Sequence, residues 1–133
     1  MMTYALDTNT IIHLLSHTPS VRIHRDAALA QGAKLIIPPY VNFELRRGFR
    51  YVNASAKEQA YLSLCARCSV GEMRTETWEL AANIYADLRR AKYTVSDADI
   101  LIAAFCIVEE LILVTNNTKD FANIKKLQII DWV

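Results

Sequence analysis

The sequence predicts a single α/β domain with a three-layer α/β/α architecture and a central parallel sheet of about four to five strands. Short apolar runs typical of buried strands alternate with longer segments that have helical periodicity. Such alternation produces a parallel sheet covered by helices on both faces. The 133 residues match the commonest size of one domain, and no linker, repeat or low-complexity stretch divides residues 1–133.

The first half of the chain contains two predicted strands, each followed by helical segments. Residues 4–6 are a short apolar run that leads into Asp7, and residues 35–37 are a compact apolar run that stops at two prolines. Apolar spacing and the closing Gly32 then predict helices. These predicted helices cover residues 9–15, 21–31 and 40–49.

The second half contains three predicted helices, at 56–67, 77–90 and 97–109, followed by strands at 111–115 and 128–130 with a turn at 116–120 between them. In the middle helix, apolar residues recur at i, i+3, i+7 and i+10 and predict its packed face. The residues of this stripe are Trp78, Ala81, Tyr85 and Leu88.

Four acidic residues are predicted to meet at one edge of the sheet, because the functional crevice of an open parallel sheet lies beyond the carboxyl ends of its strands. Asp7 directly follows the first strand, and Asp120 comes just after the strand at 111–115. Glu44 lies about two turns into the helix that follows the second strand. Asp99 lies in the first turn of the helix at 97–109, whose start should reach the same edge.

Carboxylates that converge in one crevice repel one another, and a divalent cation relieves that repulsion. Hard oxygen ligands without nearby Cys or His favour Mg²⁺ or Mn²⁺ over Zn²⁺. Two such ions can activate a water and neutralise the leaving oxygen in phosphodiester hydrolysis. The predicted metal ligands are Asp7, Glu44, Asp99, Asp97 and Asp120, with all but Asp97 also predicted as catalytic, and the predicted substrate-positioning residues are Asn9, Arg47, Thr115 and Asn117.

The same acids are also consistent with purely structural roles. Asp7 is well placed to cap the helix that follows it. Asp97 and Asp99, after Ser96, would favour a helix N-terminus through its dipole, and Asp120 is consistent with a surface turn. Independent caps would not need to share one edge of the sheet, so their convergence favours the metal site.

Other features of the composition narrow the class of protein. A net charge of +1 provides no global field for nucleic acid, so RNA binding would need a local cluster, and Arg47 shares a helix face with Glu44 at i+3. The pair Cys65 and Cys68 ends a helical segment, which indicates incidental thiols. We expect a cytoplasmic protein without a membrane span, and a hydrophobic fraction of 53% suggests a surface covered by another subunit.

Four stretches resemble the PIN-domain family, and in particular the VapC toxins of bacterial toxin–antitoxin pairs. They are LDTN at 6–9, FEL at 43–45, SDADILIAA at 96–104 and VTNNTKDF at 114–121, and the closing IDW at 130–132 is also similar. The resemblance covers almost the whole chain and makes Asp7, Glu44 and Asp99 the central acids and Asp97 an accessory acid. The fourth metal ligand is open, because many relatives have an acid where this chain has Asn117.

The resemblance implies a Mg²⁺- or Mn²⁺-dependent endoribonuclease that cuts a structured RNA, often a tRNA or a ribosomal RNA loop, without a covalent intermediate. It also implies a homodimer that a cognate antitoxin inhibits by entering the active-site groove. Two alternatives belong to other classes of protein. One is a receiver-like phosphoacceptor signalling domain, and the other is a catalytically silent module that keeps the fold to bind a partner.

Overall fold

The computed structural model describes residues 2–133, so Met1, where the predicted domain begins, lies outside the described residues. Residues 2–133 form five strands and seven helices. The strands are β1 Thr3–Leu6, β2 Lys34–Ile37, β3 Ser69–Val70, β4 Ile112–Val114 and β5 Ile129–Ile130. The helices are α1 Thr8–Leu15, α2 Pro19–Ala30, α3 Pro39–Tyr51, α4 Ser55–Cys65, α5 Thr75–Arg90, α6 Asp97–Val108 and α7 Thr118–Phe121.

The sheet is parallel throughout residues 2–133, with the strand order β3-β2-β1-β4-β5. The chain winds outward from β1 to β2 and β3, and then crosses to the other side of β1 to form β4 and β5. The strand order therefore reverses between β1 and β4, which is where ligands bind in open α/β sheets. In this pair Leu6 is opposite Val114, so the residues that follow both strands emerge side by side.

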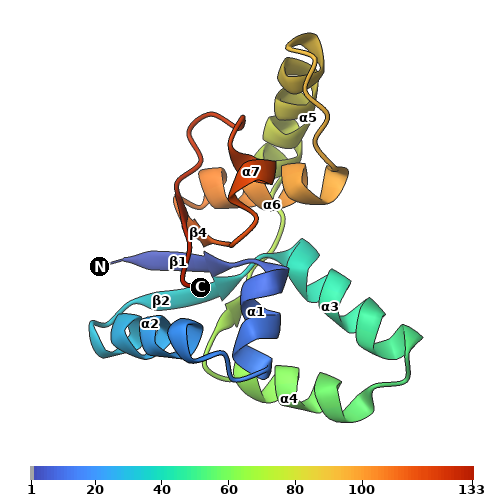
Figure 1. Cartoon of the computed structure of the whole chain (residues 1–133). Helices are drawn as coiled ribbons and strands as arrows, with labels where there is room; N and C mark the ends of the chain where they lie inside the picture. The colour runs from blue at the N-terminus through green and yellow to red at the C-terminus, as the bar shows by residue number, and fades with distance from the viewer. Residues whose placement is uncertain (1) are drawn as a thin grey trace.

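Helices cover both faces of the sheet and confirm the predicted three-layer architecture. Figure 1 shows α1, α2 and α4 on one side and α5 and α6 on the other, with α3 extending beyond the carboxyl ends of the strands. The central strands are apolar and fully buried at Leu6, Ile37 and Leu113, as expected for strands covered on two faces. No helix in residues 2–133 combines the length and the apolar character needed to cross a membrane.

Two elements differ from the sequence prediction. Ser69 and Val70 form the edge strand β3, which pairs with β2 although both residues are exposed. A two-residue exposed strand has no apolar pattern, so periodicity does not detect it. The predicted turn at 116–120 contains the start of the short helix α7, whose residue Phe121 is fully buried and anchors this segment to the core.

The packed face of α5 also differs from the prediction. Ala81 and Leu88 are buried as predicted, but Trp78 is 54% exposed and Tyr85 is 43% exposed. The buried stripe runs instead through Thr77, Ala81 and Leu88. The face that packs is thus rotated toward Thr77 and Ala81, whose small side chains allow close approach of a neighbouring element, and the two aromatic rings are left exposed.

Candidate active site

Asp7 is positioned by the pairing of β1 with β4. The backbone N–H of Asp7 donates to the carbonyl oxygen of Val114 at 3.0 Å, which continues the ladder by one residue. Asp7 is also the N-cap of α1, and its Oδ1 accepts from the N–H of Thr8 at 2.8 Å. The capping role proposed from the sequence is therefore present, and the residue is only 4% exposed.

The second carboxylate oxygen of Asp7 is held by Thr115, the residue that follows β4. The Thr115 Oγ1 donates to Asp7 Oδ2 at 2.7 Å, and Asn9 Nδ2 donates to the same oxygen at 3.4 Å. Thr115 is fully buried, and its hydroxyl accepts from the N–H of Asn117 at 3.0 Å. Burial raises the pKa of Asp7, while the Thr115 hydrogen bond acts in the opposite direction without cancelling the effect.

Glu44 reaches the same position from α3. The Thr8 hydroxyl donates to Glu44 Oε1. Thr8 directly follows Asp7 and begins α1, so this bond holds Glu44 of α3 near Asp7. Arg47, one turn further along α3, places its Nη2 at 3.8 Å from Glu44 Oε2. Glu44 is half-buried and has the cationic neighbour that the i+3 spacing predicted.

Asp99 enters the site from the first turn of α6. Ser96 caps this helix, with its Oγ accepting from the N–H of Asp99 at 3.2 Å. Burial raises the pKa of Asp99 to about 6, and the negative charges of Asp7, Asp120 and Glu44 add to this effect. Asp7, Asp120 and Glu44 therefore lie close enough to Asp99 for their negative charges to raise its pKa.

The three central acids line one cavity of about 270 Å³. Its lining residues are Asp7, Thr8, Asn9, Ile12, Glu44, Ser96, Ala98, Asp99, Ile102 and Asn117. Among the residues proposed from the sequence, this set includes Asp7, Asn9, Glu44, Asp99 and Asn117. Thr8 and Ser96 had no predicted functional role. Thr8 directly follows Asp7, and Ser96 caps the helix that carries Asp99.

Four of the proposed site residues lie outside this lining. Asp97 is the exposed first residue of α6, and Asp120 is exposed in α7, where its charge still raises the pKa of Asp99. Thr115 is buried behind Asp7, and its hydroxyl donates to Asp7 and accepts from the side chain of Asn9 and the backbone N–H of Asn117. Arg47 lies at the edge of the cavity through its contact with Glu44.

The chemistry of these residues fits a hydrated hard cation. They offer carboxylate and amide oxygens, and no Cys or His lines the cavity. Across residues 2–133, no three acidic, His or Cys side chains are close enough to enclose an ion by themselves. An ion with few protein ligands, which keeps several waters and takes oxygens from its substrate, suits this arrangement.

The thiols have no features of a reactive site. Cys65 and Cys68 are half-buried and Cys106 is buried, and all three are free. Burial raises the pKa of the Cys68 thiol to about 11, so it is protonated at neutral pH and is a poor nucleophile. This agrees with the incidental role predicted from their place at the end of a helical segment.

Comparison with known proteins identifies the family. Ribonuclease VapC2 of Rickettsia felis is 28% identical over 98% of both chains, and the tRNA(fMet)-specific endonuclease VapC of Salmonella typhimurium is 28% identical over 99% of both. A crystal structure of VapBC2 from Rickettsia felis, bound to a DNA fragment from their promoter, contains a chain that matches with a TM-score of 0.90. That chain is 25% identical, and the match covers 99% of this protein and 100% of that chain. The family model described as "PIN domain" matches residues 4–127, so the protein belongs to the PIN-domain family.

Proposed function

We propose that this protein is a Mg²⁺- or Mn²⁺-dependent endoribonuclease that hydrolyses RNA phosphodiester bonds and acts as the toxin of a toxin–antitoxin pair. The observation that carries the proposal is the convergence of Asp7, Glu44 and Asp99 on one cavity at the reversal of strand order. The raised pKa values of Asp7 and Asp99 support a cation there, since uncompensated negative charge is what a cation would relieve. The ribonuclease names of the VapC relatives support RNA as the substrate.

Asp7, Glu44 and Asp99 would hold the metal together with bound waters and substrate oxygens, since these side chains alone do not enclose an ion. Asp120 would add charge directly or through a bound water. When bound, the ions would supply a water activated for attack and a neutralised leaving oxygen. Thr115 would fix the direction of the Asp7 carboxylate, and Thr8 would fix that of Glu44. This hydrogen-bonded support keeps a site in one geometry.

Polar residues at the cavity would position the RNA. Asn9 and Asn117 line it and carry amide groups suited to ribose and phosphate oxygens. Arg47 would contact a phosphate beside Glu44. Asp97, the exposed first residue of α6, lies outside the cavity lining, and we propose that it acts there as an accessory acid.

We infer the partners of this protein from those of similar proteins. Similar structures include VapBC2 of Rickettsia felis and VapBC-1 of Haemophilus influenzae, which supports a cognate antitoxin as the partner. We propose that this antitoxin inhibits by entering the active-site groove. We further propose a homodimer and a cytoplasmic location, and we expect a tRNA or a ribosomal RNA loop as the substrate. The three free thiols suit a reducing compartment.

The receiver-like alternative fails on topology. Receiver domains have the strand order 2-1-3-4-5, whereas the order here is β3-β2-β1-β4-β5. In addition, Thr115 follows β4 where that alternative expects a Lys. A catalytically silent PIN module is the competing outcome of the experiment below.

The proposal is tested with Asp7→Asn in a cleavage assay on total RNA and purified tRNA. We expect cleavage to fall at least about a hundredfold, because the amide removes a metal ligand that supplies several kcal/mol of charge stabilisation. The fold should be intact, since Asn still accepts from Thr8 at the helix cap. Asp87→Asn, at an exposed position on α5, is the matched control and should cleave like the wild type.

Metal removal separates the active enzyme from the silent module. Wild-type cleavage should stop in EDTA and return with Mg²⁺ or Mn²⁺, because the acids alone provide no electrophile. Equal cleavage by Asp7→Asn and the wild type, or cleavage that persists in EDTA, would reject the proposed mechanism. A well-folded wild-type protein that cleaves no RNA with either metal would identify the silent module.

A further inference from the structure

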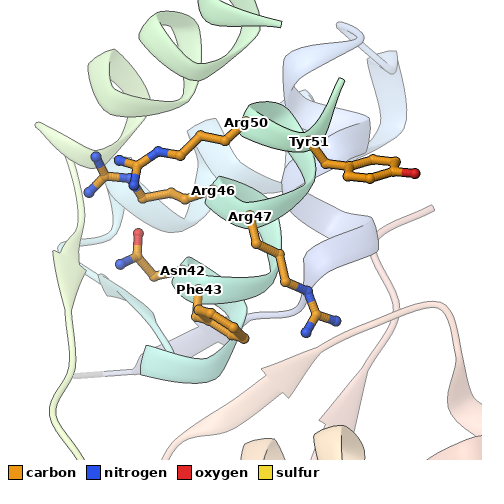
Figure 2. A pocket seen from close by; sticks show the side chains of 6 residues that line it. All are labelled: Asn42, Phe43, Arg46, Arg47, Arg50 and Tyr51. Atoms are coloured by element: carbon orange, nitrogen blue, oxygen red, sulfur yellow. The ribbon is translucent and has the colours of Figure 1, made fainter. Parts of the chain in front are cut away.

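One exposed side of α3 carries aromatic and cationic side chains that begin beside Glu44. Tyr40, Phe43, Arg47 and Tyr51 share a face, because they recur at i, i+3, i+7 and i+11. Phe43 is 53% exposed and Tyr51 is 88% exposed. Figure 2 shows Arg47 and Tyr51 directed to the same side of the helix, with Phe43 one turn before Arg47. We call Phe43, Arg47 and Tyr51 the α3 strip.

Arg47 links this strip to the acidic cavity. Its guanidinium carbon lies 5.0 Å from the centre of the Phe43 ring and 5.9 Å from that of Tyr40. The same side chain lies 3.8 Å from Glu44 Oε2. The Phe43 ring therefore lies against Arg47, which also contacts Glu44 of the acidic cavity, and about half of its surface is open to solvent.

The strip borders a locally basic surface. A cavity of about 670 Å³ lies along α3, lined by Asn42, Phe43, Arg46, Arg47, Arg50 and Tyr51. Figure 2 shows Arg46 and Arg50 directed away from Arg47, and both contact Glu58 of α4, at 2.9 Å and 3.2 Å. Glu58 neutralises only one of these two charges, so a net positive charge remains on this side of a chain whose total charge is +1.

We infer that the α3 strip binds the single-stranded part of the RNA next to the cleaved bond, with a base stacked on Phe43 and phosphates on the neighbouring arginines. This inference rests on the proposed ribonuclease function and adds the residues that hold the substrate. Exposed aromatic rings beside a positive groove are how proteins bind single-stranded nucleic acid, since every base has a face that can stack. Tyr51 lies seven residues beyond Glu44, or about 10 Å along the helix axis, within reach of a flanking nucleotide.

An exposed aromatic residue alone would not indicate RNA binding, because single exposed apolar side chains are common on protein surfaces. Here the ring is paired with a cation that also contacts a site acid, and the cavity beside it is lined by three arginines. Positive charge favours a polyanion over an apolar partner surface. A protein partner on the same strip is therefore the competing outcome.

The test measures binding of a fluorescein-labelled single-stranded oligoribonucleotide of about sixteen nucleotides, a length that covers such a site. Fluorescence anisotropy is recorded with Mg²⁺ in an Asp7→Asn background, so that the probe is not cut. Phe43→Leu keeps an apolar side chain without a stacking face and should weaken binding roughly five- to hundredfold. Phe43→Trp keeps the face and should bind like its parent.

The matched control is Tyr85→Leu on α5. Arg89 lies 5.0 Å from the centre of the Tyr85 ring, so this pair has the same chemistry as the α3 strip but lies on a helix outside both cavities described above. Tyr85→Leu should leave binding unchanged. With one abasic position in the probe at the cleavage site, Phe43→Leu should bind as its parent does, because no base is left to stack.

Three outcomes would overturn the inference. Phe43→Leu could bind the intact probe as tightly as its parent, or Tyr85→Leu could weaken binding equally, or Phe43→Leu could bind RNA normally and only escape inhibition by the antitoxin. The last result would identify a protein contact. Cleavage by the otherwise wild-type protein is measured separately, so a failure of the proposed ribonuclease activity is distinguished from a failure of this binding surface.

Discussion

Asp7 is the one buried carboxylate in residues 2–133, and its surroundings only partly compensate its charge. Thr115 and Thr8 donate to its two oxygens, which fixes the carboxylate in one direction. Burial and the nearby Glu44 nevertheless raise its pKa. Asp99 is affected in the same way, so the unliganded site stores unfavourable electrostatic energy that a bound cation would release.

This balance predicts that Asp99→Asn stabilises the metal-free protein. The pKa of Asp99 is about 6 in the fold against an ordinary value of 3.8, so its ionisation favours the unfolded chain. The penalty is absent below about pH 4 and complete above about pH 6. Solvent screens part of it at this half-buried position, and we expect a gain of about 1–2 kcal/mol at about pH 7.5.

Urea unfolding in EDTA at about pH 7.5 and at about pH 4 measures this gain. The Asn variant should be more stable than the wild type at the higher pH and no more stable at the lower pH, where the carboxyl is protonated in both states. Added Mg²⁺ should then stabilise the wild type more than the variant. A variant that is less stable than the wild type at the higher pH would show that Asp99 contributes a structural bond that outweighs its repulsion.

The geometry of α6 explains why the sequence alone could not decide between Asp97 and Asp99 as the acid that lines the cavity. Asp97 and Asp99 are two residues apart on α6, so their side chains leave the helix about 200° apart and only one can face the cavity. The sequence pattern identifies both acids, but not the rotation of the helix. The structure shows that Asp99 is the one that lines the cavity.

At the scale of elements, apolar runs predicted the buried strands well. The runs at 4–6, 35–37 and 111–115 became β1, β2 and β4, and the acids after the first and second lie in the cavity. The pattern did not reveal β3, because its two residues are exposed and its pairing with β2 comes from tertiary contacts. The predicted α5 stripe was confirmed at Ala81 and Leu88 but wrong at Trp78 and Tyr85, since the helix packs through Thr77 and leaves both aromatic rings exposed.

The segment after β3 gives an element-scale prediction, because Gly71 touches the core. Its N–H donates to the carbonyl oxygen of Ile37 at 2.9 Å, and a Cβ at this position would overlap the buried ring of Phe105 on α6. Gly71→Ala should therefore destabilise the protein by about 1–3 kcal/mol, as expected for overpacking. Chemical denaturation at equal protein concentration measures the change.

Gly48→Ala is the matched control for this substitution. Gly48 lies on the exposed side of α3, and a Cβ there would meet no atom within 4 Å. The alanine should stabilise the helix by about 0.5–1 kcal/mol. Equal effects of the two substitutions would mean that the Phe105 ring moves aside freely and that the contact does not hold β3 against α6.

The whole molecule brings together groups that are distant in sequence. The reversal of strand order between β1 and β4 places Asp7 beside Thr115, and α3 and α6 then contribute Glu44 and Asp99. The 15 Lys and Arg residues and the 14 Asp and Glu residues of the chain leave a net charge of only +1. Composition alone therefore conceals an arrangement in which one surface suits metal ions and the adjacent one suits phosphates.

The surface of the whole molecule also predicts self-association. Ile23 is 67% exposed, Val52 is 65% exposed and Trp78 is 54% exposed, in a chain with a hydrophobic fraction of 53%. Contact between two copies would remove part of this apolar surface from water, at roughly 25 cal/mol per Å² buried. We therefore expect sedimentation velocity at micromolar concentration to show a species of about twice 15.1 kDa.

Charged substitutions test whether a specific apolar contact forms the dimer. Ile23→Lys, Val52→Lys and Trp78→Lys are made separately, and a residue buried between the two copies should dissociate them when it is replaced, because an unpaired charge would be buried. A lysine outside the interface should leave the dimer intact, so the variants that remain dimeric are the controls for any variant that dissociates. A single species of 15.1 kDa at every concentration of the wild type would contradict the homodimer.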